Sequence, residues 1–283
     1  MGRAMTVSRC GAGFPVNQAG LIQKNFSSAG IARRKSPYLR HRHGLVRRME
    51  ASGRHRSARR RPGRCKVSYQ VANDFLNPER ALIFRITHRK NLSWMLENGL
   101  HCRHSPDFDP EFVNIGNADL IDKRNHHPVR HPMGDTLGDY VPFYFTPFSP
   151  MLLNIKTGRG VPQRPMEEII ILGTSLPHLQ ELDIPFVFTD RHAYLKTAQF
   201  SSDLDDLDWI DWDMLRRRDF KRDPEDPMKF ERYQAEALIH RHLPIDALQG
   251  VFCYNAEVGE RITRRVEKCG VDLKVVVRPK WYL

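Results

Sequence analysis

The sequence predicts an α+β fold, and two observations support this class. Short apolar runs typical of strands are mixed with helical patterns, without the strict strand–helix alternation of a parallel α/β protein. The chain has 283 residues, 40% of them hydrophobic, which is enough for one well-buried core. We therefore expect one folded domain over residues 71–283, preceded by an extension over residues 1–70.

The extension is strongly basic. It holds 17 of the 45 Lys and Arg residues but only one of the 33 acidic residues, Glu50, so the remainder keeps 28 basic and 32 acidic residues. Like-charge runs such as residues 59–61 (RRR) repel and disfavour compaction, which favours a disordered tail or an upstream extension. A basic tether for DNA or RNA and an organelle transit peptide stay open as alternatives. The domain itself is slightly acidic, so it must bind any anion through a local patch.

Several classes of protein are excluded. The five cysteines are irregularly spaced and form no CxxC pair, which indicates a reducing compartment. With no run of 18 apolar residues and no secretory signal pattern, we expect a cytoplasmic protein without a membrane segment. Phosphate-loop, dinucleotide-binding, HExxH and hydrolase motifs are absent, and we expect no metal, because His101 and His104 flank Arg103 in a polar loop without a second ligand cluster.

The local patterns place the elements in order. Residues 81–87 predict a strand and residues 91–98 an amphipathic helix that stops at Gly99. Residues 101–139 predict a long polar loop with one short helix, and residues 234–240 fit either a strand or a helix. Further strands are expected at residues 140–146, 168–172, 185–189, 250–255 and 273–278, and further helices at residues 149–158, 193–200, 207–218 and 256–269.

Taken singly, the polar candidates are weakly informative. Glu236, viewed alone, is typical of a surface helix acid with a partner near Arg232. Arg124, viewed alone, is a loop charge beside Lys123. Arg85 is more telling, because a single Arg inside an apolar strand must find an ion-pair partner or an anionic ligand.

Four segments, taken together and in order, resemble the DarT family of DNA ADP-ribosyltransferase toxins. The resemblance extends from about residue 81 to Trp281-Tyr282, roughly the last 200 residues. The regions at residues 182–192 (LDIPFVFTDRH) and 205–212 (DDLDWIDW) are also family-like. The four segments are residues 83–88 (IFRITH) followed by Asn91-Leu92, residues 120–125 (LIDKRN), residues 139–147 (DYVPFYFTP) with Ser149-Pro150-Met151, and Gln234-Ala235-Glu236 with His240.

The resemblance implies an ADP-ribosyltransferase fold, with two small facing β-sheets, surrounding helices and a cleft for NAD. It places Arg85, where several members have His, and Thr87 at the NAD-binding positions of the first strand. An Arg there favours the pyrophosphate, because a guanidinium is a bidentate donor to phosphate. His88 would line the adenosine pocket or cap the next helix. Of the alternating aromatics, Tyr144 or Phe145 would stack on nicotinamide.

The resemblance also implies the chemistry. Glu236 matches the family's catalytic glutamate and Arg124 its catalytic arginine. Cleavage of the bond between ribose and nicotinamide passes through an oxocarbenium-like state, which a carboxylate stabilises. The same glutamate is suited to take the N3 proton of thymine, so that the base can attack the ribose. A fixed guanidinium offsets charge on the thymine carbonyl oxygens.

The expected protein is thus a toxin that uses NAD to ADP-ribosylate thymidine in single-stranded DNA and so blocks replication. Its expected partners are single-stranded DNA and a macrodomain antitoxin like DarG. An ADP-ribosyltransferase with a protein or RNA acceptor, and an inactive nucleic-acid-binding module, stay open as alternatives. The long loop would form one wall of the DNA channel and residues 216–222 (RRRDFKR) the other, with Arg103, Lys123, Arg130, Arg216 and Arg218 as the candidate DNA contacts.

Overall fold

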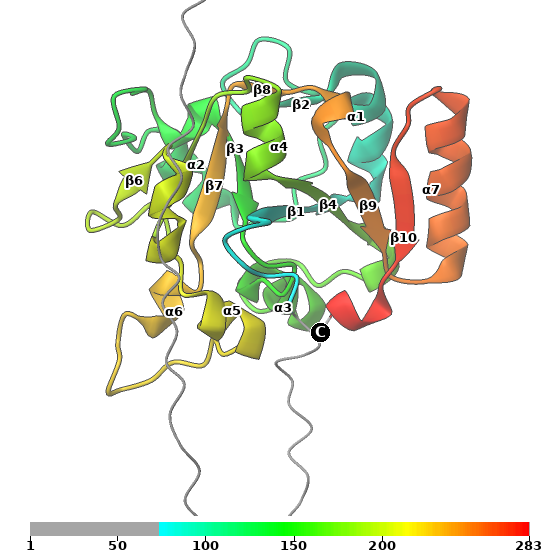
Figure 1. Ribbon diagram of the computed structural model, residues 1–283. Helices are drawn as coiled ribbons and strands as arrows, with labels where there is room; N and C mark the ends of the chain where they lie inside the picture. The colour runs from blue at the N-terminus through cyan, green and yellow to red at the C-terminus, as the bar shows by residue number, and fades with distance from the viewer. Residues whose placement is uncertain (1–73, 283) are drawn as a thin grey trace, which may run out of the picture. The chain divides into compact units, whose positions relative to one another are not determined.

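The computed structural model describes residues 74–282. The expected extension over residues 1–70, and the domain boundary beside it, lie outside the described residues. In this part of the chain, strands and helices alternate irregularly, as Figure 1 shows. The strands are β1 (Leu82–His88), β2 (Leu100–His101), β3 (Tyr140–Tyr144), β4 (Ile169–Ser175), β5 (Phe186–Thr189), β6 (Phe200–Ser201), β7 (Glu236–His240), β8 (His242–Leu243), β9 (Gly250–Cys253) and β10 (Lys274–Val277).

The helices are short apart from the last. Longer ones begin at side chains that cap the first turn, such as Ser149, whose hydroxyl accepts the N–H of Leu152 with Pro150 at the first helical position. The α-helices are α1 (Leu92–Asn98), α2 (Ala118–Asn125), α3 (Pro150–Thr157), α4 (Leu176–Glu181), α5 (Trp212–Arg217), α6 (Lys229–Arg232) and α7 (Ala256–Lys268). The 3-10 turns are η2 (Arg89–Asn91), η3 (Leu137–Asp139), η4 (Met166–Glu168), η5 (Leu204–Trp209), η6 (Ile245–Ala247) and η7 (Pro279–Trp281).

Eight strands form one sheet in the order β10-β9-β4-β1-β3-β7-β5-β6. β1 pairs with β4 along its whole length, and β3 pairs with β7 from Tyr140↔His240 to Tyr144↔Glu236. β1 and β3, in contrast, are joined through a single registered pair, Phe84↔Tyr144. The expected α+β class is confirmed, with one difference: the two small sheets are halves of a single hydrogen-bonded sheet, because this one pair connects them.

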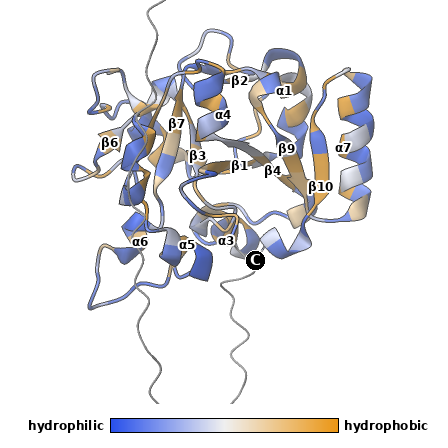
Figure 2. Cartoon of the chain, viewed as in Figure 1, coloured by the Kyte–Doolittle hydropathy of each residue, from blue (hydrophilic) through white to orange (hydrophobic). Residues whose placement is uncertain are grey.

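The core lies on both faces of this sheet. β4 is buried at all seven positions, which explains its continuous apolar sequence (IIILGTS). α7 packs against β9 and β10 with an apolar stripe that includes Val258, Ile262 and Val266, and its other face is hydrophilic (Figure 2). Tyr282 is fully buried near the C-terminus, and its hydroxyl donates to carbonyls of Ile169 and Phe252.

The predictions of two helices are wrong. Residues 193–200 form consecutive turns that lead into β6. Their hydrogen bonds join residues three apart, such as the Leu195 N–H and the His192 carbonyl. The expected helix over residues 207–218 is divided into η5 and α5, because the Asp211 side chain caps a new helix by accepting the N–H of Met214. The ambiguous segment at residues 234–240 contains a strand, β7.

Candidate active site

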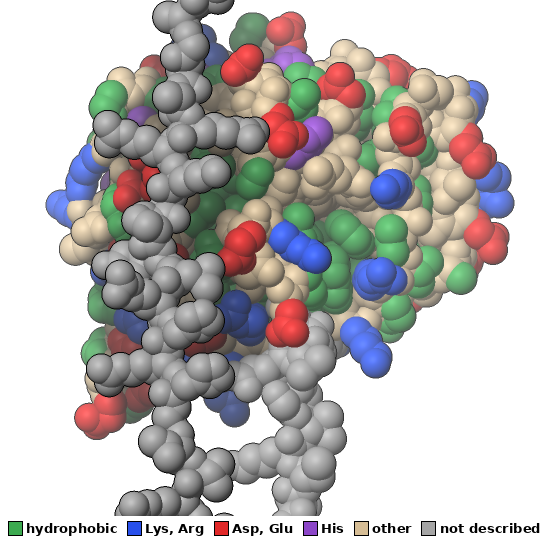
Figure 3. Space-filling model, in the orientation of Figure 1, with side chains coloured by type: hydrophobic (Ala, Val, Ile, Leu, Met, Phe, Trp, Pro, Cys, Tyr) green, Lys and Arg blue, Asp and Glu red, His purple; other side chains and the backbone are tan. Residues whose placement is uncertain are grey.

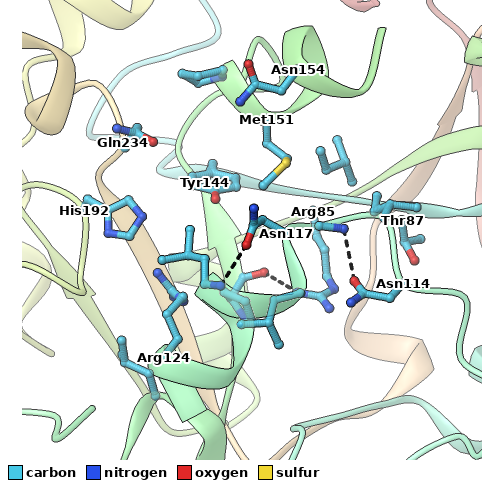
Figure 4. A pocket seen from close by; sticks show the side chains of 18 of the residues that line it. Arg85, Thr87, Asn114, Asn117, Arg124, Tyr144, Met151, Asn154, His192 and Gln234 are labelled. Carbon is cyan, nitrogen blue, oxygen red and sulfur yellow. Dashed lines mark hydrogen bonds between the residues drawn. The ribbon is translucent and has the colours of Figure 1, made fainter. Parts of the chain in front are cut away.

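A cavity of about 790 Å³ opens where β1 and β3 diverge. β1 contributes Arg85 and Thr87, which are two residues apart and so share one face of the strand. Tyr144 enters from β3, Arg124 from α2 and Met151 from α3 (Figure 4). The volume is within the range of a cofactor-sized pocket, so a dinucleotide fits this space.

Arg124 and Glu236 form a buried ion pair at this cavity. The Arg124 Nη1 and Nη2 atoms donate to the Glu236 Oε1 and Oε2 atoms at 2.9 and 2.6 Å. The side chain of Glu236 is 0% exposed and that of Arg124 is 14% exposed. Arg124 lines the cavity and Glu236 does not, so the guanidinium lies between the carboxylate and the cavity.

Three further contacts fix Glu236 at the start of β7. The backbone N–H of Ala193 donates to Oε1 at 3.0 Å, and the Nδ1 atom of His192 lies 3.7 Å from the same oxygen. The Glu236 N–H donates to the hydroxyl of Thr189 in β5. Burial by itself raises the pKa of the Glu236 carboxyl, but the charge of Arg124 and these donors outweigh burial, so the pKa lies below its ordinary value. The site therefore holds an ionised carboxylate.

Arg85 has an incomplete set of partners. Its Nη1 atom donates to the Pro142 carbonyl at 2.8 Å, while its Nε atom is buried without a hydrogen-bond partner. Burial lowers the pKa of Arg85 to about 10, so the guanidinium stays charged at neutral pH. A half-buried cation with a buried, unpartnered donor is suited to an anionic ligand, as the expected contact with a pyrophosphate requires. Thr87, beside it, is held by the Asn91 side chain, which donates to its hydroxyl at 3.0 Å.

Tyr144 lines the same cavity as the two arginines (Figure 4). Burial, and then the charge of Glu236, raise the pKa of its hydroxyl to about 12. The phenol is therefore protonated at neutral pH, and its ring presents an aromatic surface to the cavity.

Two expected NAD-binding residues lie outside the cavity. His88 is 2% exposed, accepts the N–H of Lys90 as the cap of η2 and contacts the Glu168 carboxylate at 3.3 Å. The structure thus supports the capping alternative for His88. Phe145 is fully buried and packs edge-to-face on Phe188, because it points to the opposite side of β3 from Tyr144.

Of the five expected DNA contacts, only Arg103 lines the cavity, where its guanidinium lies over the Phe108 ring. Lys123 is exposed on α2 outside the cavity, and Arg130 donates to the Lys196 carbonyl. The last two have structural contacts instead: Arg216 pairs with Asp213 and donates to the Leu76 carbonyl, and Arg218 lies 3.4 Å over the Phe148 ring centre.

The structure also brings residues to the cavity that the sequence reasoning did not single out. His192 ends the family-like segment at residues 182–192, yet it was assigned no role there. Phe220, Lys221 and Arg222 belong to the expected second wall of the DNA channel. The sequence, however, predicts only Arg216 and Arg218 of that wall as DNA contacts. The remaining side chains without an expected role include Asn117, Met151, Asn154, Phe230 and Gln234. Their types are common in any loop, and only the folded chain shows that they face one space.

A glutamate on a sheet strand, held beside a dinucleotide-sized cavity with an anion-seeking arginine on the neighbouring half-sheet, defines an ADP-ribosyltransferase type of site. A family model described as "ssDNA thymidine ADP-ribosyltransferase, DarT" matches residues 84–283. The chain belongs to the DarT family, as its motifs indicate. Within residues 74–282, no group of three His, Cys, Asp or Glu residues is arranged to hold a metal ion, and no helix is long and apolar enough to cross a membrane.

Relatives named as DNA ADP-ribosyl transferases match about three quarters of this chain and nearly all of their own length. A DNA ADP-ribosyl transferase of Escherichia coli O127:H6 is 52% identical over 208 residues, which are 73% of this chain and 95% of the relative. The solved structure of Thermus sp. 2.9 DarT in complex with ADP-ribosylated ssDNA is 32% identical, with a TM-score of 0.67, and covers 73% of this chain and 98% of its own. The same Thermus protein in complex with NAD+ has a TM-score of 0.64 and covers 73% and 99%.

Proposed function

We propose that this protein transfers ADP-ribose from NAD to N3 of thymidine in single-stranded DNA. The observation that carries the proposal is the Arg124–Glu236 pair at a cavity whose other wall holds Arg85 with a buried, unpartnered donor. Membership of the DarT family supports the same reaction.

NAD would lie along β1 and β3. Arg85 would bind the pyrophosphate through the donors that the Pro142 carbonyl leaves unused, and Thr87 would border the bound nucleotide. Tyr144 would offer its ring face to the nicotinamide, and its protonated hydroxyl would act as a donor. These contacts orient the ribose towards the Arg124–Glu236 pair without adding a further negative charge to the cavity.

The reaction breaks the bond between the ribose C1 atom and the nicotinamide nitrogen. Nicotinamide leaves as a neutral molecule with the bonding electron pair, and positive charge develops on the ribose. The Glu236 carboxylate stabilises that charge and takes the N3 proton, so that N3 forms the new bond to C1. Arg124 offsets the negative charge that thymine acquires on its carbonyl oxygens as the proton leaves.

The DNA strand would enter at the end of the cavity that carries Lys221 and Arg222. Phe230 lies there beneath the Arg222 guanidinium, 4.7 Å from its ring centre, so bases and phosphates would both find partners. On the face that Figure 3 shows, Lys and Arg are intermixed with Asp and Glu. Such a mixed surface favours DNA contacts through a few local groups.

The proposed biological role is that of a toxin that acts on chromosomal DNA in the cytoplasm. The free thiols of Cys102, Cys253 and Cys269 are consistent with a reducing compartment. Its proposed partner is a macrodomain antitoxin like DarG, which removes ADP-ribose from DNA. Co-expression with such a macrodomain should restore growth that this protein alone arrests.

The decisive experiment incubates the full chain with NAD and a single-stranded oligonucleotide that contains one thymidine, followed by mass spectrometry of the DNA. We expect an added ADP-ribose on thymine, lost by at least about a thousand-fold in Glu236→Gln. Glu257→Gln, an exposed change on α7, is the matched control and should retain full activity. Absence of an adduct from wild-type protein that binds NAD would contradict the DNA acceptor.

A further inference from the structure

Arg159 is a cavity-lining arginine whose side chain contacts no partner within residues 74–282. It follows α3, and its side chain is exposed. Other arginines of the same cavity differ in this respect, because Arg124 is paired with Glu236 and the Arg222 guanidinium lies over the Phe230 ring. The Arg159 guanidinium is therefore available to a ligand in the cavity.

The turn that carries Arg159 is fixed in place. Gly158 and Gly160, on either side, have φ values of 74° and 71°, in the left-handed region that favours glycine. The backbone N–H of Arg159 donates to the Asn154 carbonyl at 3.0 Å, and the side-chain amide of Asn117 donates to the Gly160 carbonyl at 3.2 Å. The turn is thus held by α3 on one side and by the start of α2 on the other.

This turn lies at the end of the cavity away from the Arg124–Glu236 pair. Asn117 caps the start of α2, whereas Arg124 is in its last turn. At 1.5 Å per residue, the two positions are about 10 Å apart along the helix. A ligand that reaches from the ion pair to Arg159 must therefore be as extended as a dinucleotide.

The wall beside this turn is joined to the proposed NAD-binding strand, β1. The Asn91 side chain exchanges two hydrogen bonds with the backbone of Val113, at 2.8 and 3.1 Å, and donates to the Thr87 hydroxyl at 3.0 Å. Figure 4 shows Thr87 on the side of the cavity opposite to His192. The wall that meets the Arg159 turn therefore belongs to the Thr87 side of the site.

We infer that Arg159 is a further NAD-binding residue, which binds the AMP half of the dinucleotide. The inference rests on the proposed function. With the reacting bond at the Arg124–Glu236 pair and the pyrophosphate at Arg85, the adenosine extends to the end of the cavity that carries Arg159. Adenine offers a flat aromatic face and its phosphate an anion, and a guanidinium binds both.

A DNA phosphate is the alternative ligand for a free cation at this cavity. Lys221 and Arg222, however, lie near the start of α3, because Arg218 of the same segment covers the ring of Phe148. Arg159 follows the other end of this eight-residue helix, which is about 12 Å long. Its position therefore favours the donor nucleotide over the DNA strand.

Separate binding of the two halves of NAD tests the inference in the full chain. Wild type and Arg159→Gln are titrated calorimetrically with AMP, nicotinamide mononucleotide and NAD. The same proteins are assayed for kcat and for the KM values of NAD and of a single-stranded oligonucleotide. Arg264→Gln, which changes an exposed arginine of α7, is the matched control.

We expect Arg159→Gln to raise the Kd for AMP and for NAD by about ten-fold, with no change for nicotinamide mononucleotide. The KM for NAD should rise to the same extent, while kcat at saturating NAD and the KM for the oligonucleotide stay as in wild type. Unchanged affinity for NAD would overturn the inference. A rise in the KM for the oligonucleotide alone would also overturn it, and would make Arg159 a DNA contact. Wild-type protein that binds NAD but does not modify thymidine would contradict the proposed DNA acceptor, and the titrations would still decide the role of Arg159.

Discussion

Arg124 has two roles in the structure, because it neutralises a fully buried carboxylate and also lines the cavity. In Arg124→Gln, Glu236 is left charged and unpaired, and we expect the free energy of unfolding at pH 7 to fall by about 3–5 kcal/mol. Without Arg124, burial raises the pKa of Glu236, so protonation near pH 5 should recover part of the loss. Urea unfolding at both pH values measures this. Lys123→Gln, an exposed neighbour, should change stability by less than about 0.5 kcal/mol at either pH.

The wild-type pair also predicts a pH dependence. The pKa of Glu236 is lowered in the folded chain, because Arg124 and the other donors outweigh burial. A carboxyl with a lowered folded pKa contributes stability above its ordinary pKa of 4.5 and loses it as the pH falls through the folded value. Glu236→Gln lacks this titration, so its unfolding free energy should fall less than that of wild type on acidification below about pH 4.5. Parallel curves for the two proteins would contradict this assignment.

Arg85 should lower the stability of the ligand-free protein and strengthen the binding of NAD. Its buried Nε atom has no partner, so Arg85→Met removes a costly charge, and we expect about 1 kcal/mol of added stability without ligand. The same variant should lose most of the rise in Tm that NAD gives to wild type. Thermal unfolding with and without NAD tests both parts. A ligand-free variant less stable than wild type would show that Arg85 is a structural residue.

At the scale of the element, the position of α2 sets the position of Arg124. A Cβ atom at Gly138 would lie 2.8 Å from the Asn125 carbonyl at the end of α2 and 2.4 Å from the His104 ring. Gly138→Ala should therefore displace the end of α2 and lower kcat by about ten- to a hundred-fold, with a smaller effect on NAD binding. Gly116→Ala is the control, because its closest neighbour is the flexible tip of Ile121. Equal kcat in the two variants would disprove the coupling.

Local sequence predicted most elements but failed where distant contacts decide the backbone. The strand β1 was predicted from a short apolar run, and the helix α3 from its Ser149-Pro150 start. Residues 193–200 contain good helix formers, yet their backbone turns, because the N–H of Ala193 donates to Glu236 and that of Gln199 to Asp190. These partners lie in other segments, so no local pattern shows them.

The site, like the fold, was predicted only in part. Family motifs identified Glu236, Arg124, Arg85, Thr87 and Tyr144 as members of one site, and the structure brings four of them to one cavity with Glu236 directly behind Arg124. The DNA contacts were chosen by charge alone, and charge does not tell a solvent-facing arginine from one that packs on an aromatic ring. Arg216 and Arg218 are examples, because the structure gives both of them contacts within the chain, and a DNA contact of either one stays a prediction.

At the scale of the whole molecule, every group of the proposed site lies within residues 74–282. We therefore expect a chain without residues 1–70 to modify a short oligonucleotide at a rate within about two-fold of the full chain at physiological salt. Rates measured over a series of salt concentrations test this. A large loss at low salt that shrinks as the salt concentration rises would identify the basic extension as a tether for nucleic acid.

The guanidinium that covers Glu236 also affects how much NAD the protein would consume when no DNA is bound. Arg124 lines the cavity and Glu236 is 0% exposed, so a bound NAD molecule would have no exposed carboxylate beside it that could activate water. A thymine that engages Arg124 would free the carboxylate at the moment when the acceptor is in place. Idle copies of the protein would then spare the NAD pool, and their toxicity would be confined to moments when DNA is unwound.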